Sequence, residues 1–277
     1  MRFFKVLKYD LSYGIIKNLS FTKIIIWIVF FTLVSYEFSG RLGNFNFEKF
    51  SLGDSFLYTY GGIKEFIPSP NELFIIPYLW ILNNLLVLFF TLHYANDDLN
   101  GYGHQLILRT ENRTSWWFSK CIWNSIIIII YYIIAWIVTT LNALLRGAEL
   151  NFEISEYMSV IMVFGSNQIA SSGWILLLEI TLMPLIITIA LGMVQMALSL
   201  VFKPAFAFIF SSVMLISSAY YMTPYLIGNF AMAVRSDKVV SNGLNLTDGI
   251  IAAIGMIIIG IIIGVLAIRR YNILSKE

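Results

Sequence analysis

Charged residues are scarce in this chain. Asp, Glu, Lys and Arg make up 12% of the 277 residues, whereas hydrophobic residues make up 58%. A soluble domain carries about 25% charged residues, so the composition excludes an ordinary soluble globular protein. The formal net charge is only +2, and we expect no nucleic-acid partner.

Cysteine and histidine are also rare. The single cysteine, Cys121, excludes an internal disulfide and a cysteine metal cluster. The two histidines, His93 and His104, lack the His-Glu-x-x-His spacing of a zinc protease, and no P-loop motif for phosphate binding occurs. We therefore expect no catalytic residues, no metal site and no cofactor in this chain.

Apolar runs are abundant. A helix that crosses the hydrocarbon core needs about 20 mostly apolar residues. Six stretches meet or approach that length, namely 21–38, 73–95, 122–145, 174–202, 205–222 and 250–268. Pro204 separates the fourth and fifth stretches, because proline suits the first turn of a helix and not its interior. The sequence predicts an all-α polytopic membrane protein with six transmembrane helices in a single domain, 1–277.

Two shorter segments complete the predicted fold. In residues 1–20, apolar side chains recur at helical spacing with lysines between them, which indicates an amphipathic helix in the membrane interface. These side chains are Phe3, Phe4, Leu7, Leu11 and Ile15. Residues 223–249 contain YLIGNFAMAV, a run too short to cross the bilayer but suited to a re-entrant or interfacial helix outside the cell.

The distribution of Lys and Arg predicts the orientation. With the N-terminus inside, twelve of the 18 basic residues fall on the cytoplasmic side. The other six, Arg41, Lys49, Lys64, Arg146, Arg235 and Lys238, fall outside. Cytoplasmic loops carry the excess of basic residues, so we expect both termini in the cytoplasm.

The cytoplasmic segment 96–121 includes the motif DDLNGYGHQLILRTENRTSWWFSK at 97–120. This segment resembles the cytoplasmic loop of type-2 ABC exporter permeases. In that family an acidic pair precedes a glycine, an apolar helix follows, and an Arg and a Lys come twelve and nineteen residues after the glycine. The matching positions here are Asp97, Asp98, Gly101, 106–108, Arg113 and Lys120. The family often has a proline shortly before the Arg, where this chain has Glu111 and Asn112.

The resemblance implies an architecture and partners. The family has six spans, an interfacial N-terminal helix, cytoplasmic termini and a short helix between spans five and six. Its loop is a coupling helix that docks on a separate ATPase subunit, which would bind ATP and Mg, and a second six-span subunit would pair with this one as a homodimer or heterodimer. The coupling residues would be Gly101, Leu106, Ile107, Leu108, Arg109, Glu111, Arg113 and Lys120. Residues 106–108 would be apolar anchors, with Arg109, Glu111 and Arg113 on the rim.

Among the polar residues inside the predicted spans, four are candidates for a functional role: Asn83, Asn84, Glu179 and Gln195. Polar groups in lipid are costly and are often functional. They would lie on a substrate pathway or subunit interface, or they would form hydrogen bonds between helices. Both interpretations stay open for all four.

The leading hypothesis is the membrane subunit of an ATP-driven exporter in a bacterial cell membrane. The spans hold no ring of charge, which favours an amphipathic or hydrophobic substrate, and our specific hypothesis is a bacteriocin-like peptide in export or immunity. The alternative is a stand-alone secondary carrier, channel or membrane scaffold without an ATPase. A carrier usually shows inverted repeats and helices broken around an ion site.

Overall fold

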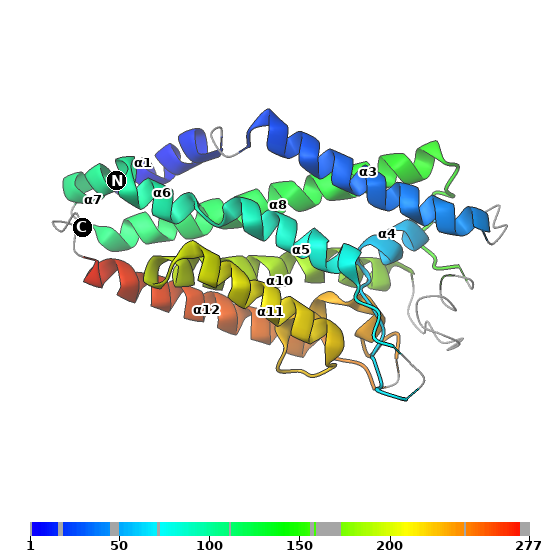
Figure 1. Ribbon diagram of the computed structural model, residues 1–277. Coiled ribbons are helices and arrows are strands. Elements are labelled where there is room, and N and C mark those ends of the chain that lie inside the picture. Colours follow the sequence, from blue (N-terminus) through cyan, green and yellow to red (C-terminus); the bar gives the residue numbers. More distant parts are fainter. Residues whose placement is uncertain are drawn as a thin grey trace.

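The computed structural model is all-helical in the part of the chain that it describes (Figure 1). The described residues are 2–15, 19–44, 50–70, 73–110, 112–155, 158, 173–240 and 242–271. Within them, β-pairing is limited to two isolated bridges, one between Ser51 and Glu149 and one between Ser236 and Leu244. The predicted all-α class is therefore confirmed.

Five helical segments in these residues, one fewer than predicted, are long and apolar enough to cross a membrane. They are α3 (Phe21–Asn44), α5 with α6 (Tyr78–Thr91 and Tyr94–Asn100), α8 (Arg113–Leu145), α10 (Gly173–Val201) and α12 (Leu246–Arg270). The sixth apolar stretch forms α11 (Pro204–Tyr220), which has only 17 residues. At 1.5 Å per residue it is about 26 Å long, slightly short of the hydrocarbon core.

The predicted break between the fourth and fifth stretches is confirmed. Helix α10 ends at Val201 and α11 begins at Pro204, which occupies its first turn. Proline lacks a backbone N–H, and the first turn of a helix leaves that group without an intrahelical partner in any case.

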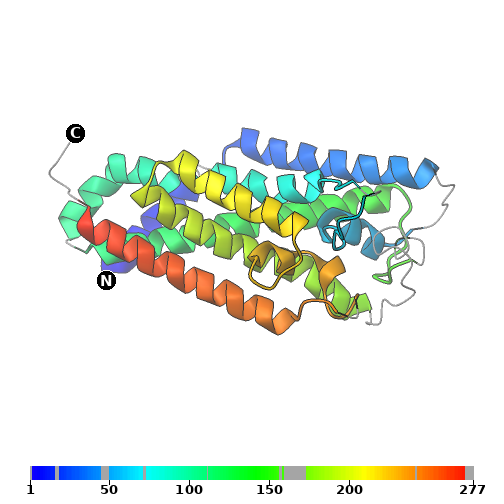
Figure 2. The same ribbon diagram turned by 60° about the horizontal axis from the view of Figure 1, so that its bottom comes forward.

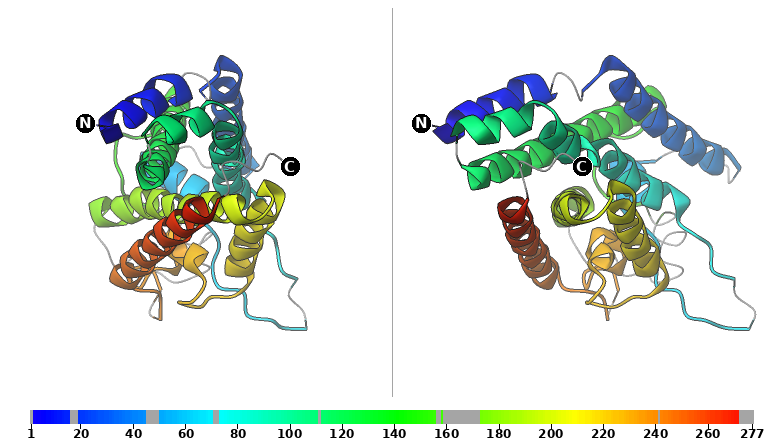
Figure 3. Two further views of the ribbon diagram at one scale, coloured as in Figure 1. Left: turned by 90° about the vertical axis from the view of Figure 1, so that its left-hand side faces the viewer. Right: turned by 60° about the vertical axis from the view of Figure 1, so that its left-hand side comes forward.

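Helix α10 lies at the centre of the bundle. It packs against α12, α11, α8 and α5, and α11 and α12 flank it on either side (Figures 2 and 3). Helix α3 lies against α8. Both chain ends lie at one end of the bundle, together with α1 (Arg2–Tyr9), α6 and α7 (Tyr102–Thr110) (Figure 1).

The N-terminal segment is helical, as predicted, but it packs through a different face. Helix α1 continues into a π-helical turn, η1 (Asp10–Gly14), and both contact α8. Its buried positions are Val6, Asp10 and Gly14, four residues apart, whereas Leu7 and Leu11 are half-buried. A charged residue thus lies on the buried face.

The segment between α3 and α5 contains a helix that the sequence analysis missed, α4 (Leu52–Tyr60). Ser51 and Asp54 form a capping box at its start, in which each side chain accepts from the backbone N–H of the other residue. The pattern Ser-x-x-Asp before an apolar run was the available signal. The helix is buried against α10, α8 and α3.

The re-entrant or interfacial helix predicted within 223–249 stays a prediction. The described part of the segment between α11 and α12, residues 221–240 and 242–245, contains no α-helix. It forms two short 3₁₀ turns, η2 (Ile227–Ala231) and η3 (Ala233–Arg235). Every residue of both turns is buried, and η2 packs against α10, α11 and α12. Other parts of the protein thus cover residues 227–235 of this segment.

Candidate functional site

A buried ion cluster joins three helices at the end of the bundle that holds both termini. We call it the Lys120 cluster; its members are Asp10, Tyr94, Asp98, Trp116, Ser119 and Lys120. The Lys120 side chain is 0% exposed and pairs with both Asp10 and Asp98, with Nζ 2.6 Å from Asp98 Oδ2. It links η1, α6 and α8, because these elements carry Asp10, Asp98 and Lys120 respectively.

The other members complete the polar contacts of the cluster. Tyr94 Oη donates to Asp10 Oδ1 over 2.8 Å, and Ser119 Oγ donates to the second Asp10 oxygen. Trp116 Nε1 donates to Asp98 Oδ2 over 2.8 Å. The Lys120 ammonium also lies 4.7 Å from the centre of the Tyr94 ring, a favourable cation–π distance. Buried charges are stable only when they are paired and hydrogen-bonded in this way.

Helices α6 and α7 form an elbow, residues 94–110, that the cluster fixes to α8. Gly103 allows the close approach of the two arms, since a Cβ there would lie 2.1 Å from Asp98 Oδ2. Asp98 in turn bonds Lys120 and Trp116 of α8. The elbow therefore has a fixed position relative to the third long apolar segment of the chain.

Helix α7 has one inward and one outward face. Ile107 is 2% exposed and packs in a core cluster with Leu99, Trp116 and Trp117. Tyr102, Gln105 and Leu108 are exposed at three-residue spacing, with Leu108 at 52%. Of the three predicted apolar anchors, Leu108 is thus available to a partner, Leu106 is half-buried, and Ile107 is an internal contact.

Two further predicted coupling residues, Arg113 and Lys120, make contacts within the chain, although Arg113 was expected on the rim. Arg113 Nη1 donates to the carbonyl oxygens of Ile268, Arg269 and Tyr271, at 3.2, 2.9 and 2.8 Å. A cation at the last carbonyls of a helix is favourable, so Arg113 caps α12. Arg109 lies in α7, and Glu111 falls outside the described residues.

A pocket of about 130 Å³ opens beside the elbow. It is lined by four tyrosines and two aspartates together with Gly101, namely Tyr9, Tyr13, Tyr94, Tyr102, Asp97 and Asp98. Burial, with a contribution from Asp98, raises the pKa of Tyr9 to about 12, so its hydroxyl is neutral near pH 7. Aromatic faces beside carboxylates suit a cationic side chain.

The asparagines of the second apolar segment belong to a buried hydrogen-bond network in mid-bundle. Tyr131 Oη donates to the Asn83 carbonyl over 2.7 Å. Asn84 Oδ1 accepts from Tyr132 Oη at 3.2 Å and from Thr188 Oγ1 at 2.8 Å. The network joins α5, α8 and α10, and contacts of this kind contribute about 0.6–2 kcal/mol each between membrane helices.

Gln195 makes a further contact between helices. Its Nε2 donates to the Leu88 carbonyl over 2.8 Å, which links α10 to α5. Buried Asn124 of α8 lies beside Gly192 of α10, where a Cβ would approach Asn124 Nδ2 to 2.9 Å. Gln195 therefore forms a hydrogen bond between two helices of the same chain.

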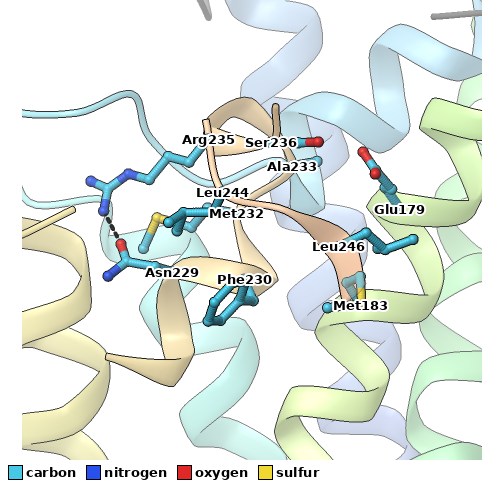
Figure 4. A pocket seen from close by; sticks show the side chains of 10 residues that line it. All are labelled: Glu179, Met183, Asn229, Phe230, Met232, Ala233, Arg235, Ser236, Leu244 and Leu246. Atoms are coloured by element: carbon cyan, nitrogen blue, oxygen red, sulfur yellow. Dashed lines mark hydrogen bonds between the residues drawn. The ribbon is translucent and has the colours of Figure 1, made fainter. Parts of the chain in front are cut away.

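Glu179 lies at the opposite end of the bundle from the Lys120 cluster. It is 4% exposed, and Oε1 lies 3.1 Å from Nζ of half-buried Lys238. Figure 4 shows its carboxylate at the edge of a small cavity, lined also by Met183 of α10 and Leu246 of α12. The cavity measures about 20 Å³, enough for one water molecule. Glu179 thus faces the protein interior.

Arg235, on the other side of this cavity, caps a second helix. Its guanidinium donates to the Ser218 carbonyl at 2.6 Å and to the Ala219 carbonyl at 2.8 Å, in the last turn of α11. It also bonds the Asn229 side chain (Figure 4) and the Ile63 carbonyl. Burial lowers the pKa of Arg235 to about 10, so the side chain stays charged near pH 7. The sequence analysis had counted this residue only as a loop charge.

Comparison with known families gives one result. The family described as "Protein of unknown function (DUF2705)" matches residues 55–274, which are 220 of the 277 residues. The chain belongs to the DUF2705 family. The DUF2705 match begins within α4 and includes the elbow and the pocket-lining part of α6 and α7. No curated protein matches the chain.

In the described part of the chain, no three His, Cys, Asp or Glu side chains are placed to hold a metal ion. Two kinds of charged contact recur in these residues: ion pairs in the interior, as in the Lys120 cluster, and helix caps, as at Arg113 and Arg235. At the end of the bundle that holds both termini (Figure 1), the outward face of α7 and its neighbouring pocket are exposed at the surface.

Proposed function

We propose that this chain is the membrane-spanning subunit of an ATP-driven exporter of the ABC type, with ATP and Mg bound by a separate ATPase subunit. Helix α11 would be the sixth span, because it is predominantly apolar and a short turn at residues 202–203 separates it from α10. Both termini would be cytoplasmic, as the distribution of Lys and Arg predicts. The elbow shares their end of the bundle (Figure 1), so it would also face the cytoplasm.

The observation that carries the proposal is the fixed attachment of an exposed amphipathic helix to two long helices. The elbow that contains α7 is joined to α8 through Asp98 of α6 and Lys120, and α8 is joined to α12 through Arg113. A displacement of α7 would therefore move both long helices. A soluble ATPase needs such a connection to transmit a conformational change into a membrane bundle.

The outward face of α7 has the chemistry of a docking surface. Tyr102 and Leu108 offer exposed apolar contacts, and interface cores are rich in aromatic and aliphatic anchors. Asp97 is exposed at the tyrosine-lined pocket and would attract an Arg or Lys side chain of the ATPase. This assignment replaces Ile107, Arg113 and Lys120 as docking residues and keeps them as the internal connection.

The substrate would be hydrophobic or amphipathic, for example a bacteriocin-like peptide in export or immunity. The mid-bundle polar groups are neutral amides and hydroxyls that bond one another, and the described spans contain no ring of charge for a hydrophilic solute. A second permease subunit would complete the pathway. The alternative function is a stand-alone carrier, channel or scaffold, which would need no docking face on α7.

Co-purification with the ATPase encoded by an adjacent reading frame tests the proposal. The variant Tyr102→Ala with Leu108→Ala removes the outward anchors, and truncation of an interface anchor commonly costs about 1–4 kcal/mol. We expect it to abolish ATPase capture and coupled ATP hydrolysis. The matched control is Tyr225→Ala with Leu150→Ala, since both residues are exposed and lie outside the elbow.

Asp97→Asn should weaken capture less, and mainly at low salt, because a rim charge steers association more than it holds the complex. Full capture and coupling by the Tyr102 and Leu108 double variant would contradict the docking assignment. The absence of any adjacent ATPase that binds the chain would favour the stand-alone alternative.

A further inference from the structure

An apolar groove runs along α10 between α11 and α12. Its volume is about 670 Å³, within the range of roughly 300–1,000 Å³ for small-ligand sites. All three helices line it with apolar side chains, among them Val194, Leu198, Phe206, Phe210, Ile259 and Ile263. Phe206 and Ile259 are more than half exposed, so the groove is open along the outer surface of the bundle.

The groove is closed at one end and open at the other. The 3₁₀ turn η2 packs against α10, α11 and α12, and it lies between α11 and α12 at the end away from the chain termini (Figure 3). The open end is formed by the turn between α10 and α11 and by the last turns of α12, which lie at the end of both termini (Figures 1 and 2).

Basic residues border the open end. Lys203 lies in the α10–α11 turn, next to Phe202, and is exposed. Arg270 follows Ile263 by seven residues, two helical turns, and so lies on the face of α12 that lines the groove. Neither Lys203 nor Arg270 forms an ion pair with another described residue. The sequence holds no Asp or Glu at 180–236 or at 249–276, so α11 and the parts of α10 and α12 that line the groove carry no acidic side chain.

The size of the groove favours a narrow occupant. A helix is about 10 Å wide, so 670 Å³ would accommodate only about 9 Å of its length, or about six residues. The volume is therefore far smaller than that of a transmembrane helix of about 20 residues. A hydrocarbon chain can follow the groove lengthwise, with its polar end at Lys203 and Arg270.

We propose that the groove binds an acyl chain of an anionic glycerophospholipid, whose phosphate headgroup lies against Lys203 and Arg270. Clusters of basic residues at the cytoplasmic end of membrane helices attract anionic headgroups. The apolar walls on α10, α11 and α12 hold the chain. Lipid binding at this site needs no ATPase. The test of this site is therefore independent of the test of the exporter proposal.

Native mass spectrometry of the detergent-purified protein tests the site. Dioleoyl phosphatidylglycerol and dioleoyl phosphatidylcholine share their acyl chains and differ in headgroup charge. Ile259→Trp places a large ring in the groove, and Ile262→Trp is its matched control, since both isoleucines are 52% exposed and only Ile259 lines the groove. Lys203→Gln with Arg270→Gln removes the charges and leaves the apolar walls intact.

We expect the wild-type protein to retain phosphatidylglycerol in preference to phosphatidylcholine. Ile259→Trp should lose the bound lipid and Ile262→Trp should keep it. Each basic side chain contributes about fivefold to the affinity for anionic lipid, so the double Gln variant should lose about thirtyfold in its preference for phosphatidylglycerol. Equal retention of the two lipids by the wild type, or equal effects of the two Trp substitutions, would overturn the proposal. Loss of a dimer in Ile259→Trp with unchanged lipid retention would assign the groove to a second copy.

Discussion

The Lys120 ammonium lies 2.6 Å from the Asp98 carboxylate in the interior of the protein, where the Lys120 side chain has no exposed surface. Asp98 precedes α7 in the chain and Lys120 follows it, so their ion pair joins the two ends of the segment that carries the exposed face of α7. Asp10 of the N-terminal helix joins the same ammonium. One buried lysine thus determines how three separate elements meet at this end of the bundle.

Replacement of Lys120 by Met should strongly destabilise the protein. The substitution leaves the Asp10 and Asp98 carboxylates buried without a counter-ion, and breaking a buried pair costs about 3–5 kcal/mol. Thermal unfolding in detergent measures the effect. Lys203→Met is the control, because Lys203 is exposed, and its midpoint should stay close to the wild-type value. Equal midpoints for the two variants would show that the Lys120 cluster does not stabilise the fold.

The Glu179–Lys238 pair should respond asymmetrically to mutation. Glu179 is 4% exposed and Lys238 is 33% exposed, so Lys238→Ala leaves a buried carboxylate alone, whereas Glu179→Gln leaves a partly solvated ammonium. The uncompensated buried charge is the more costly of the two. We expect the lower unfolding midpoint for Lys238→Ala. The reverse order would mean that Glu179 is held by other contacts.

Two glycines of α12 should behave in opposite ways. A Cβ at Gly264 would lie 2.0 Å from the buried Trp117 ring, whereas a Cβ at Gly255 meets no atom within 4 Å. Gly264→Ala should therefore destabilise the protein by about 1–3 kcal/mol through overpacking. Gly255→Ala should be neutral or stabilising, by up to about 1 kcal/mol, through helix propensity. Unfolding midpoints that fall equally in both variants would contradict this assignment of the α12 contact.

Cysteine labelling tests the orientation. In a Cys121→Ala background, an impermeant maleimide applied to intact cells should label Glu153→Cys and leave Gln105→Cys unlabelled. Both positions are exposed, so reactivity reports the side of the membrane. Permeabilised cells should label both variants, which controls for accessibility. Labelling of position 105 and not 153 in intact cells would reverse the assigned topology.

The sequence by itself determined the helical class, the long apolar helices and the break at Pro204. These features are local, because the length of an apolar run sets the length of a helix in lipid and proline stops a helix at its own position. The run 205–222 became a helix of only 17 residues, since helix ends depend on the contacts of their last turns. The short helix α4 had a local signal in its capping box, although its burial did not follow from that signal.

Only the tertiary structure decided which residues meet. Asp10 and Lys120 are 110 positions apart, and neither sequence segment indicates the other as its partner. The helical period of α7 permitted Ile107 or Leu108 to be the exposed residue, and packing against Trp116 and Trp117 decided between them. From the sequence, Arg113 was predicted to be a surface charge. In the folded protein it donates to three carbonyl oxygens at the end of α12. Local sequence sets which segments are helical, but the partner of a buried charge is set by segments that become neighbours only when the bundle packs.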